Sequence, residues 1–110
     1  MKNEFFGRLN DPTASSYVKG VCGEEVEYYL VIRDGIIHDV KYYTEGCQDI
    51  LCCGQAVCRR VKGKSVEDAL CVSPGEIIHS NECEFDDGRH CAILAVIGFL
   101  KAAADYMLQP

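Results

Sequence analysis

The stretch "VEYYLVIRDGIIHDVKYYT", residues 26–44, sets the architecture of the chain. Val26, Tyr28, Leu30 and Ile32 occupy every second position, and Glu27, Tyr29 and Val31 lie between them. This period of two residues is typical of a strand with one buried face. Asp34-Gly35 follows, and this dipeptide is the strongest short-range signal for a tight hairpin. Residues 36–44 are β-branched and aromatic, so we expect them to pair back antiparallel on the first strand.

Upstream of the hairpin, residues 15–21 have a weakly extended pattern and predict a third strand. Residues 1–9 are expected to form an N-terminal arm or a short helix, which Asn10-Asp11-Pro12 ends. The sheet should therefore be a three-stranded antiparallel meander.

Downstream of Gly46 the apolar period becomes helical and continues to Val61, where Lys62-Gly63-Lys64 ends the helix. A short helix is expected over residues 66–71, and another after Ser73, which forms a capping box with Glu76. The last helix should run from residue 90 to residue 107 and be largely buried. Helices on one face of a small antiparallel sheet make an α+β fold, in one domain over residues 1–110.

The composition argues against several classes of partner. Eleven basic and seventeen acidic residues give a net charge of −6, without a basic run that would attract nucleic acid. The longest apolar run, residues 91–100, is shorter than the ~20 residues that span a bilayer. The first residues lack the apolar core of a signal peptide. We therefore expect a cytoplasmic protein that binds neither nucleic acid nor membrane.

Eight cysteines are unusual in a domain of this kind, and four of them lie in "EGCQDILCCGQAVC", residues 45–58. In a cytoplasmic chain such cysteines favour metal or sulfur chemistry over disulfides. Helical geometry assigns Cys58 and Cys53 to core packing and leaves Cys52 open between exposure and reactivity. Cys47 differs, because it begins the helix, where free N–H groups favour a thiolate.

Other residues with metal-binding side chains also lie at segment ends. Cys22 and Glu24 flank Gly23 at the start of a strand, and His90 and Cys91 begin the last helix. With Cys47 these residues are expected to converge at one end of the sheet. The spacings between the cysteines match no compact zinc-ribbon pattern. The residues therefore predict a thiol-rich metal or sulfur site without naming its occupant.

Several motifs, taken in order, resemble one family. They are Cys22-Gly23-Glu24, "DGIIHDVKYYTEGC", "VKGKSVEDA" and "HCAILA", followed by "AAADY". This set is similar to the NifU/IscU family of iron–sulfur cluster scaffold proteins, from about residue 21 to residue 106. The resemblance implies that Cys22, Cys47 and Cys91 are the cluster cysteines and that His90 is the neighbouring histidine. Glu24 stands where the family usually has aspartate.

The resemblance also implies a function. It predicts a non-catalytic scaffold that assembles a [2Fe–2S] cluster from iron and sulfur supplied by a cysteine desulfurase, and transfers it to apo-proteins. Mixed thiolate, carboxylate and imidazole ligation suits a cluster that must be released. The family's Leu-Pro-Pro-Val-Lys stretch, which engages a dedicated chaperone, is replaced here by residues 84–89, "EFDDGR". This replacement argues against delivery through that chaperone.

Two other functions suit the same residues. Cys22, Cys47, Cys91 and either Glu24 or His90 could hold tetrahedral zinc, in a regulatory or partner-activating subunit of sulfur metabolism. An enzyme with Cys91 as nucleophile and His90 as base is less favoured, because adjacent residues at a helix start seldom form such a pair. Visible absorption after anaerobic reconstitution distinguishes a cluster from colourless zinc.

Overall fold

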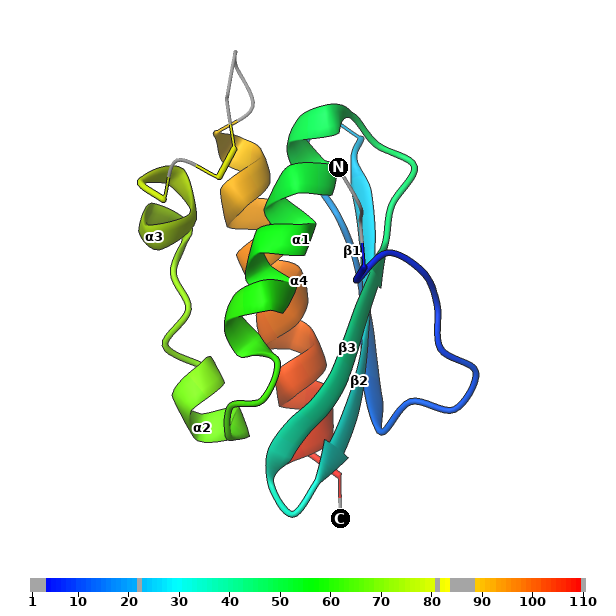
Figure 1. The fold of residues 1–110 in the computed structure, drawn as a ribbon. Helices are drawn as coiled ribbons and strands as arrows, with labels where there is room; N and C mark the ends of the chain where they lie inside the picture. Colours follow the sequence, from blue (N-terminus) through cyan, green and yellow to red (C-terminus); the bar gives the residue numbers. More distant parts are fainter. Residues whose placement is uncertain (1–3, 22, 81, 84–88, 110) are drawn as a thin grey trace.

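The computed structural model describes residues 4–21, 23–80, 82–83 and 89–109. Its strands and helices follow one another along the chain as in Figure 1. The strands are β1 (Ala14–Lys19), β2 (Glu25–Arg33) and β3 (Ile36–Tyr43). The helices are α1 (Gln48–Val61), α2 (Val66–Ala69), α3 (Pro74–Ile78) and α4 (His90–Met107).

The sheet is the antiparallel meander that the sequence predicts, in the order β1-β2-β3. Asp34 and Gly35 both have positive φ, 54° and 75°, as a tight hairpin turn of the I′ type requires. Along β2 the buried residues alternate with less buried ones, so one face of the sheet belongs to the core. The predicted α+β class and strand order are therefore confirmed.

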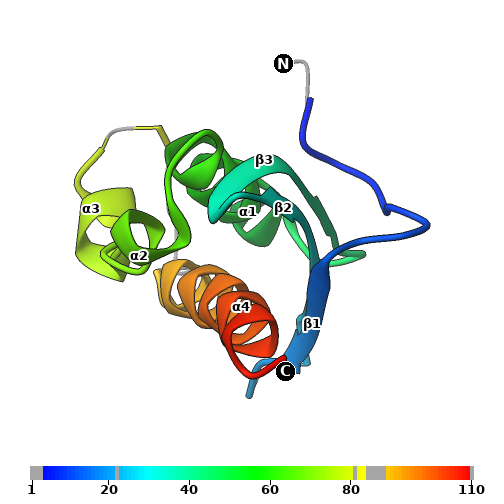
Figure 2. The ribbon, with the colours of Figure 1, turned by 90° about the horizontal axis from the view of Figure 1, so that it is seen from below.

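Figure 2 shows that α1 and α4 cover one face of the sheet, with α2 and α3 on their outer side. Two glycines allow this close packing. A Cβ on Gly54 of α1 would lie 2.5 Å from a ring carbon of Tyr42, and one on Gly98 of α4 would lie 2.8 Å from the ring of Tyr28. The helices therefore lie directly on the tyrosine rings of the sheet.

The helix α4 is long and apolar enough to cross a membrane by length and composition alone. Half of its 18 residues are buried inside the fold, where they pack on the sheet and α1. This burial is what the central helix of a globular core shows, and the sequence predicted it.

Residues 4–9, the described part of the N-terminal segment, form an arm and not a short helix. It lies along β3, where the Gly7 N–H donates to the Tyr42 carbonyl at 2.8 Å and the Tyr42 N–H donates to the Phe5 carbonyl at 3.0 Å. Since β3 is an edge strand of the sheet, the arm satisfies backbone groups that would otherwise face water.

Two expectations about α1 are wrong. A helical projection of residues 48–61 puts Gln55 opposite the apolar stripe and predicts that it is exposed, but only 3% of its surface is exposed, because α3 and α4 cover α1 beyond the face on the sheet. The second concerns disulfides, which were not favoured. Cys52 is joined to Cys83 by a disulfide, since the segment after α3 packs back on α1. Cys53 and Cys58 are buried, as predicted.

Candidate metal and sulfur site

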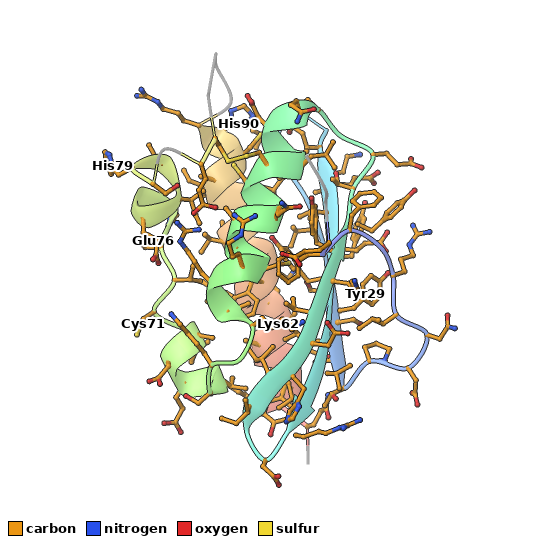
Figure 3. All side chains as sticks on the ribbon, in the orientation of Figure 1. Tyr29, Lys62, Cys71, Glu76, His79 and His90 are labelled. Carbon is orange, nitrogen blue, oxygen red and sulfur yellow. A yellow bond between two sulfur atoms is a disulfide. The ribbon has the colours of Figure 1, made fainter. Side chains whose placement is uncertain are left out.

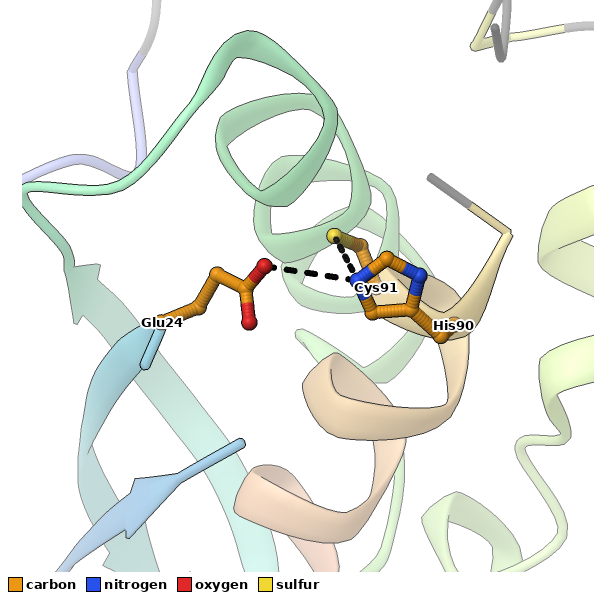
Figure 4. A group of neighbouring side chains, drawn as sticks. All are labelled: Glu24, His90 and Cys91. Atoms are coloured by element: carbon orange, nitrogen blue, oxygen red, sulfur yellow. Dashed lines mark hydrogen bonds and ion pairs between the residues drawn. The ribbon is translucent and has the colours of Figure 1, made fainter. Parts of the chain in front are cut away.

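Three potential metal ligands meet where β2 begins and α4 begins (Figure 4). The Nε2 atom of His90 lies 3.3 Å from Oε1 of Glu24 and 3.8 Å from Sγ of Cys91. One ligand atom from each residue lies within 4.8 Å of the other two. A carboxylate, an imidazole and a thiol therefore surround a volume that one metal ion could occupy.

The backbone leaves room for Glu24 because glycines surround it. A Cβ on Gly20 would lie 3.2 Å from Oε2 of Glu24, and one on Gly46 would lie 3.8 Å from its Cγ and 2.6 Å from Cγ2 of Ile50. The Thr44 hydroxyl fixes the turn before α1 by accepting from the Gly46 N–H at 3.0 Å. The loops that precede β2 and α1 are thus packed around the Glu24 side chain.

The Glu24 carboxylate is largely shielded, with 15% of its side chain exposed. Its Oε1 atom faces His90, whereas the buried Oε2 atom has no hydrogen-bond partner among the described residues. A buried carboxylate oxygen without a partner is costly, and a metal ion is one group that satisfies it. The donor set and this unpaired oxygen both fit a bound cation.

Cys47 is the N-cap residue of α1 and is exposed. Its thiol lies near enough to those of Cys91 and Cys53 to raise the pKa of both electrostatically, which places it beside the Glu24–His90–Cys91 group. Cys91 is buried, and burial raises the pKa of its thiol to about 12, with Cys47 and Glu24 adding to the effect. Solvent therefore reaches the group from Cys47 and His90, which are exposed.

The structure thus brings together four of the five residues named from the sequence. Glu24, His90 and Cys91 form one group, and the Cys47 thiol lies near enough to Cys91 to raise the pKa of its thiol. The fifth, Cys22, lies outside the described residues.

The sequence did not single out Cys53 as a neighbour of this group. Burial raises the pKa of the Cys53 thiol to about 12, and Cys91 and Cys47 act on it in the same direction. Its place on the apolar stripe of α1 predicted burial but could not show that α4 brings Cys91 beside it. Gly20 and Thr44 were also missed, because only the folded loops show that they adjoin Glu24 and Gly46.

An apolar groove of about 670 Å³ adjoins the site. It runs between β1 and α4, begins at His90 and includes the half-exposed side chains of Ile93 and Ile97. Lys19 and Lys101 also line it. Apolar surface is therefore available for contact directly beside the candidate ligands.

Comparison with protein families gives one decisive match. The model of the NifU-like N-terminal domain matches residues 3–110, almost the whole chain. The chain belongs to this family. The resemblance inferred from the sequence motifs is thereby confirmed.

Members of the family with curated names are similar over most of this chain. The iron–sulfur cluster assembly scaffold protein IscU of Escherichia coli is 33% identical over 101 residues, which cover 88% of this chain and 77% of that protein. IscU of Haemophilus influenzae is 34% identical over 87 residues, covering 77% and 68%. IscU 1 of Archaeoglobus fulgidus is 28% identical over 91% of this chain, which spans 66% of its length.

Solved structures of the family have the same fold. The N-terminal part of a NifU-like protein from Brucella abortus superposes with a TM-score of 0.76, at 17% identity, covering 99% of this chain and 89% of the other. A protein from Fervidobacterium islandicum, described as an iron–sulfur cluster assembly scaffold for the SUF system, gives a TM-score of 0.74, at 18% identity, covering 93% and 88%. These structures support the three-stranded α+β architecture of the family.

Proposed function

We propose that this protein is a scaffold on which a [2Fe–2S] cluster is assembled and from which it is transferred to apo-proteins. The observation that carries the proposal is the group of Glu24, His90 and Cys91, whose ligand atoms lie within 4.8 Å of one another, with the free Cys47 thiol near Cys91. Similar proteins of the family are named as cluster assembly scaffolds, which favours this role over the zinc-binding regulatory subunit.

The mixture of donor types suits assembly followed by release. Thiolates are the preferred donors to an iron–sulfur cluster, and Cys47 and Cys91 supply two, with Cys22 proposed as the third. A carboxylate oxygen or an imidazole nitrogen binds iron less firmly than a thiolate does. Glu24 and His90 therefore offer the corner of the site that an incoming thiol can replace.

Sulfur is proposed to come from a cysteine desulfurase. Cys47 is the exposed thiol of the site, so it can accept a sulfane sulfur from a persulfide of that enzyme. The Cys47 thiolate attacks the outer sulfur of the persulfide, the S–S bond of the persulfide breaks as the new S–S bond on Cys47 forms, and the donor cysteine leaves as a thiolate. The chemistry that generates the persulfide belongs to the partner, and for this reason we regard the chain as a scaffold and not as an enzyme.

The remaining parts of the proposal concern partners and location. Apo-iron–sulfur proteins would receive the cluster, and residues 84–89 argue against delivery by the chaperone that engages Leu-Pro-Pro-Val-Lys. Residues 84–88 lie outside the described residues. A cytoplasmic location follows from the need to keep the ligand cysteines as thiols.

Anaerobic reconstitution with ferrous iron, a cysteine desulfurase, cysteine and a thiol reductant, which supplies the electrons that convert sulfane sulfur to sulfide, tests the proposal. The wild-type chain should develop sulfur-to-iron charge-transfer bands in the visible spectrum, and Cys91→Ser and Cys47→Ser should lose most of this absorption. Cys71→Ser is the matched control, because Cys71 is an exposed cysteine at the far end of the helix layer from His90 (Figure 3). A colourless wild-type protein that holds one zinc ion would contradict the scaffold role.

A further inference from the structure

The disulfide between Cys52 and Cys83 has no place in the scaffold role. Cys52 lies on α1 and Cys83 follows α3, 31 residues later, with 5.9 Å between their Cα atoms. This Cα distance is typical of a disulfide. Neither residue belongs to the group around Glu24, and neither matches the cluster cysteines that the family resemblance names. The pair therefore requires an explanation of its own.

Ion pairs hold the two cysteines together independently of the sulfur–sulfur bond. Glu82, the residue before Cys83, forms ion pairs with Arg59 and Arg60 of α1. These arginines lie two turns along the helix from Cys52. When the bond between the sulfurs opens, Glu82 still holds Cys83 against α1. A pre-positioned dithiol of this kind closes again readily, because little chain entropy is lost on closure.

The Cys52 sulfur has an interaction partner in both redox states, covalent in one and hydrogen-bonded in the other. In the oxidised state its sulfur is joined to Cys83, and in the reduced state the carbonyl oxygen of Glu82, 3.3 Å away, can accept from its thiol. Cys52 is partly exposed, whereas Cys83 is 8% exposed. An incoming thiolate therefore reaches the Cys52 sulfur, and Cys83 is the leaving group.

We propose that Cys52 and Cys83 form a reversible thiol–disulfide exchange site whose substrate is a dithiol, either a small molecule or the active site of a dithiol oxidoreductase. One substrate thiolate attacks the Cys52 sulfur, the bond to Cys83 breaks, and Cys83 leaves as a thiolate that takes up a proton. The second substrate thiol then attacks the mixed disulfide and releases Cys52. Two electrons pass to the cysteine pair, and the substrate departs as a disulfide.

A redox titration without iron tests the proposal. The chain is equilibrated in buffers with stepped ratios of reduced to oxidised dithiothreitol, and free thiols are trapped with N-ethylmaleimide and located by peptide mass mapping. Cys52 and Cys83 should become labelled together in one two-electron transition, while exposed Cys71 is labelled at every ratio. Labelling of Cys52 and Cys83 at every ratio, or at separate ratios, would overturn the proposal.

The role of Glu82 is tested by a matched pair of variants. In Glu82→Gln both ion pairs to α1 are lost, so less free energy favours the closed disulfide. The Cys52–Cys83 disulfide should therefore be half reduced at a ratio of reduced to oxidised dithiothreitol roughly threefold to tenfold lower than in wild type. Glu76→Gln is the control, because Glu76 also faces Arg60, at 3.6 Å, but does not precede Cys83. Equal midpoints for Glu82→Gln, Glu76→Gln and wild type would refute the tethering. Because no iron is present, these outcomes are independent of cluster assembly.

Discussion

Glu24 is the ligand residue whose surroundings bear most directly on the proposed release of the cluster. One carboxylate oxygen faces His90, and the other has no hydrogen-bond partner among the residues that the structure describes. The family usually has aspartate at this position, so the longer side chain keeps the charge and adds a methylene. Oxygen binds iron less firmly than sulfur does, so this carboxylate can yield its position to an incoming thiol.

Replacing Glu24 by alanine should therefore slow transfer of the cluster to an apo-ferredoxin and lengthen its lifetime on the scaffold. We expect a change of roughly tenfold in the transfer rate, which corresponds to about 1.4 kcal/mol in the barrier. Circular dichroism of the recipient follows the transfer, and Glu24→Asp should stay near wild type. Glu25→Ala is the control, because Glu25 is exposed and its carboxylate accepts a hydrogen bond from the Tyr17 hydroxyl, outside the Glu24–His90–Cys91 group. Equal rates for Glu24→Ala and Glu25→Ala would contradict a role for Glu24.

Cys58 shows that a cysteine of this chain can serve packing alone. It is fully buried, and burial raises the pKa of its thiol far above its ordinary value, so it remains a neutral apolar side chain. Cys58→Ala should lower the free energy of unfolding by about 1–2 kcal/mol, measured by chemical denaturation, with cluster assembly intact. Cys71→Ala, at an exposed position, should change it by less than about 0.5 kcal/mol. Loss of assembly in a folded Cys58→Ala protein would contradict this assignment.

At the scale of elements, the position of α1 depends on Gly54. A methyl group there would lie 2.5 and 2.6 Å from two ring carbons of Tyr42, whose hydroxyl donates to the Leu51 carbonyl on the same helix. Gly54→Ala should therefore lower the free energy of unfolding by roughly 1–3 kcal/mol, although alanine is the better helix former. Thermal unfolding followed by circular dichroism measures the effect.

Gly75 of α3 supplies the comparison for Gly54. No described atom lies within 4 Å of a Cβ built at Gly75. Gly75→Ala should therefore leave the free energy of unfolding unchanged or raise it by up to about 1 kcal/mol. If both alanine variants had the same stability as wild type, the close packing of α1 on β3 would be disproved.

Local signals predicted the elements, and long-range contacts decided what was missed. Asp34-Gly35 makes its turn within the hairpin, and Ser73 and Glu76 cap α3 from three residues apart, so neighbouring residues are sufficient for both. Cys52 and Cys83 meet only because the segment after α3 packs on α1, and a helical projection of α1 cannot contain that information. The burial of Gln55 was missed for the same reason.

At the scale of the whole molecule, the candidate site exists because the start of β2 and the start of α4 lie side by side. Glu24 and His90 are 66 residues apart in sequence, and they meet because α4 lies against β1 and β2 with its first turn beside the start of β2. Spacing alone did not predict the site, since no compact ligand pattern is present. The position of each ligand residue at the end of a strand or helix predicted that they converge, the order of the family motifs suggested the occupant, and the packing of α4 on the sheet brings Glu24 and His90 within reach of each other.

A scaffold of this kind both assembles the cluster and transfers it intact to a recipient protein. The most direct measurement loads the scaffold with ⁵⁷Fe and ³⁴S-labelled sulfide and mixes it anaerobically with an apo-ferredoxin and an iron chelator. A scaffold should deliver both labels to the recipient in equal amounts, with little ⁵⁷Fe on the chelator. Capture of the iron by the chelator, with a recipient that stays without a cluster, would contradict the claim.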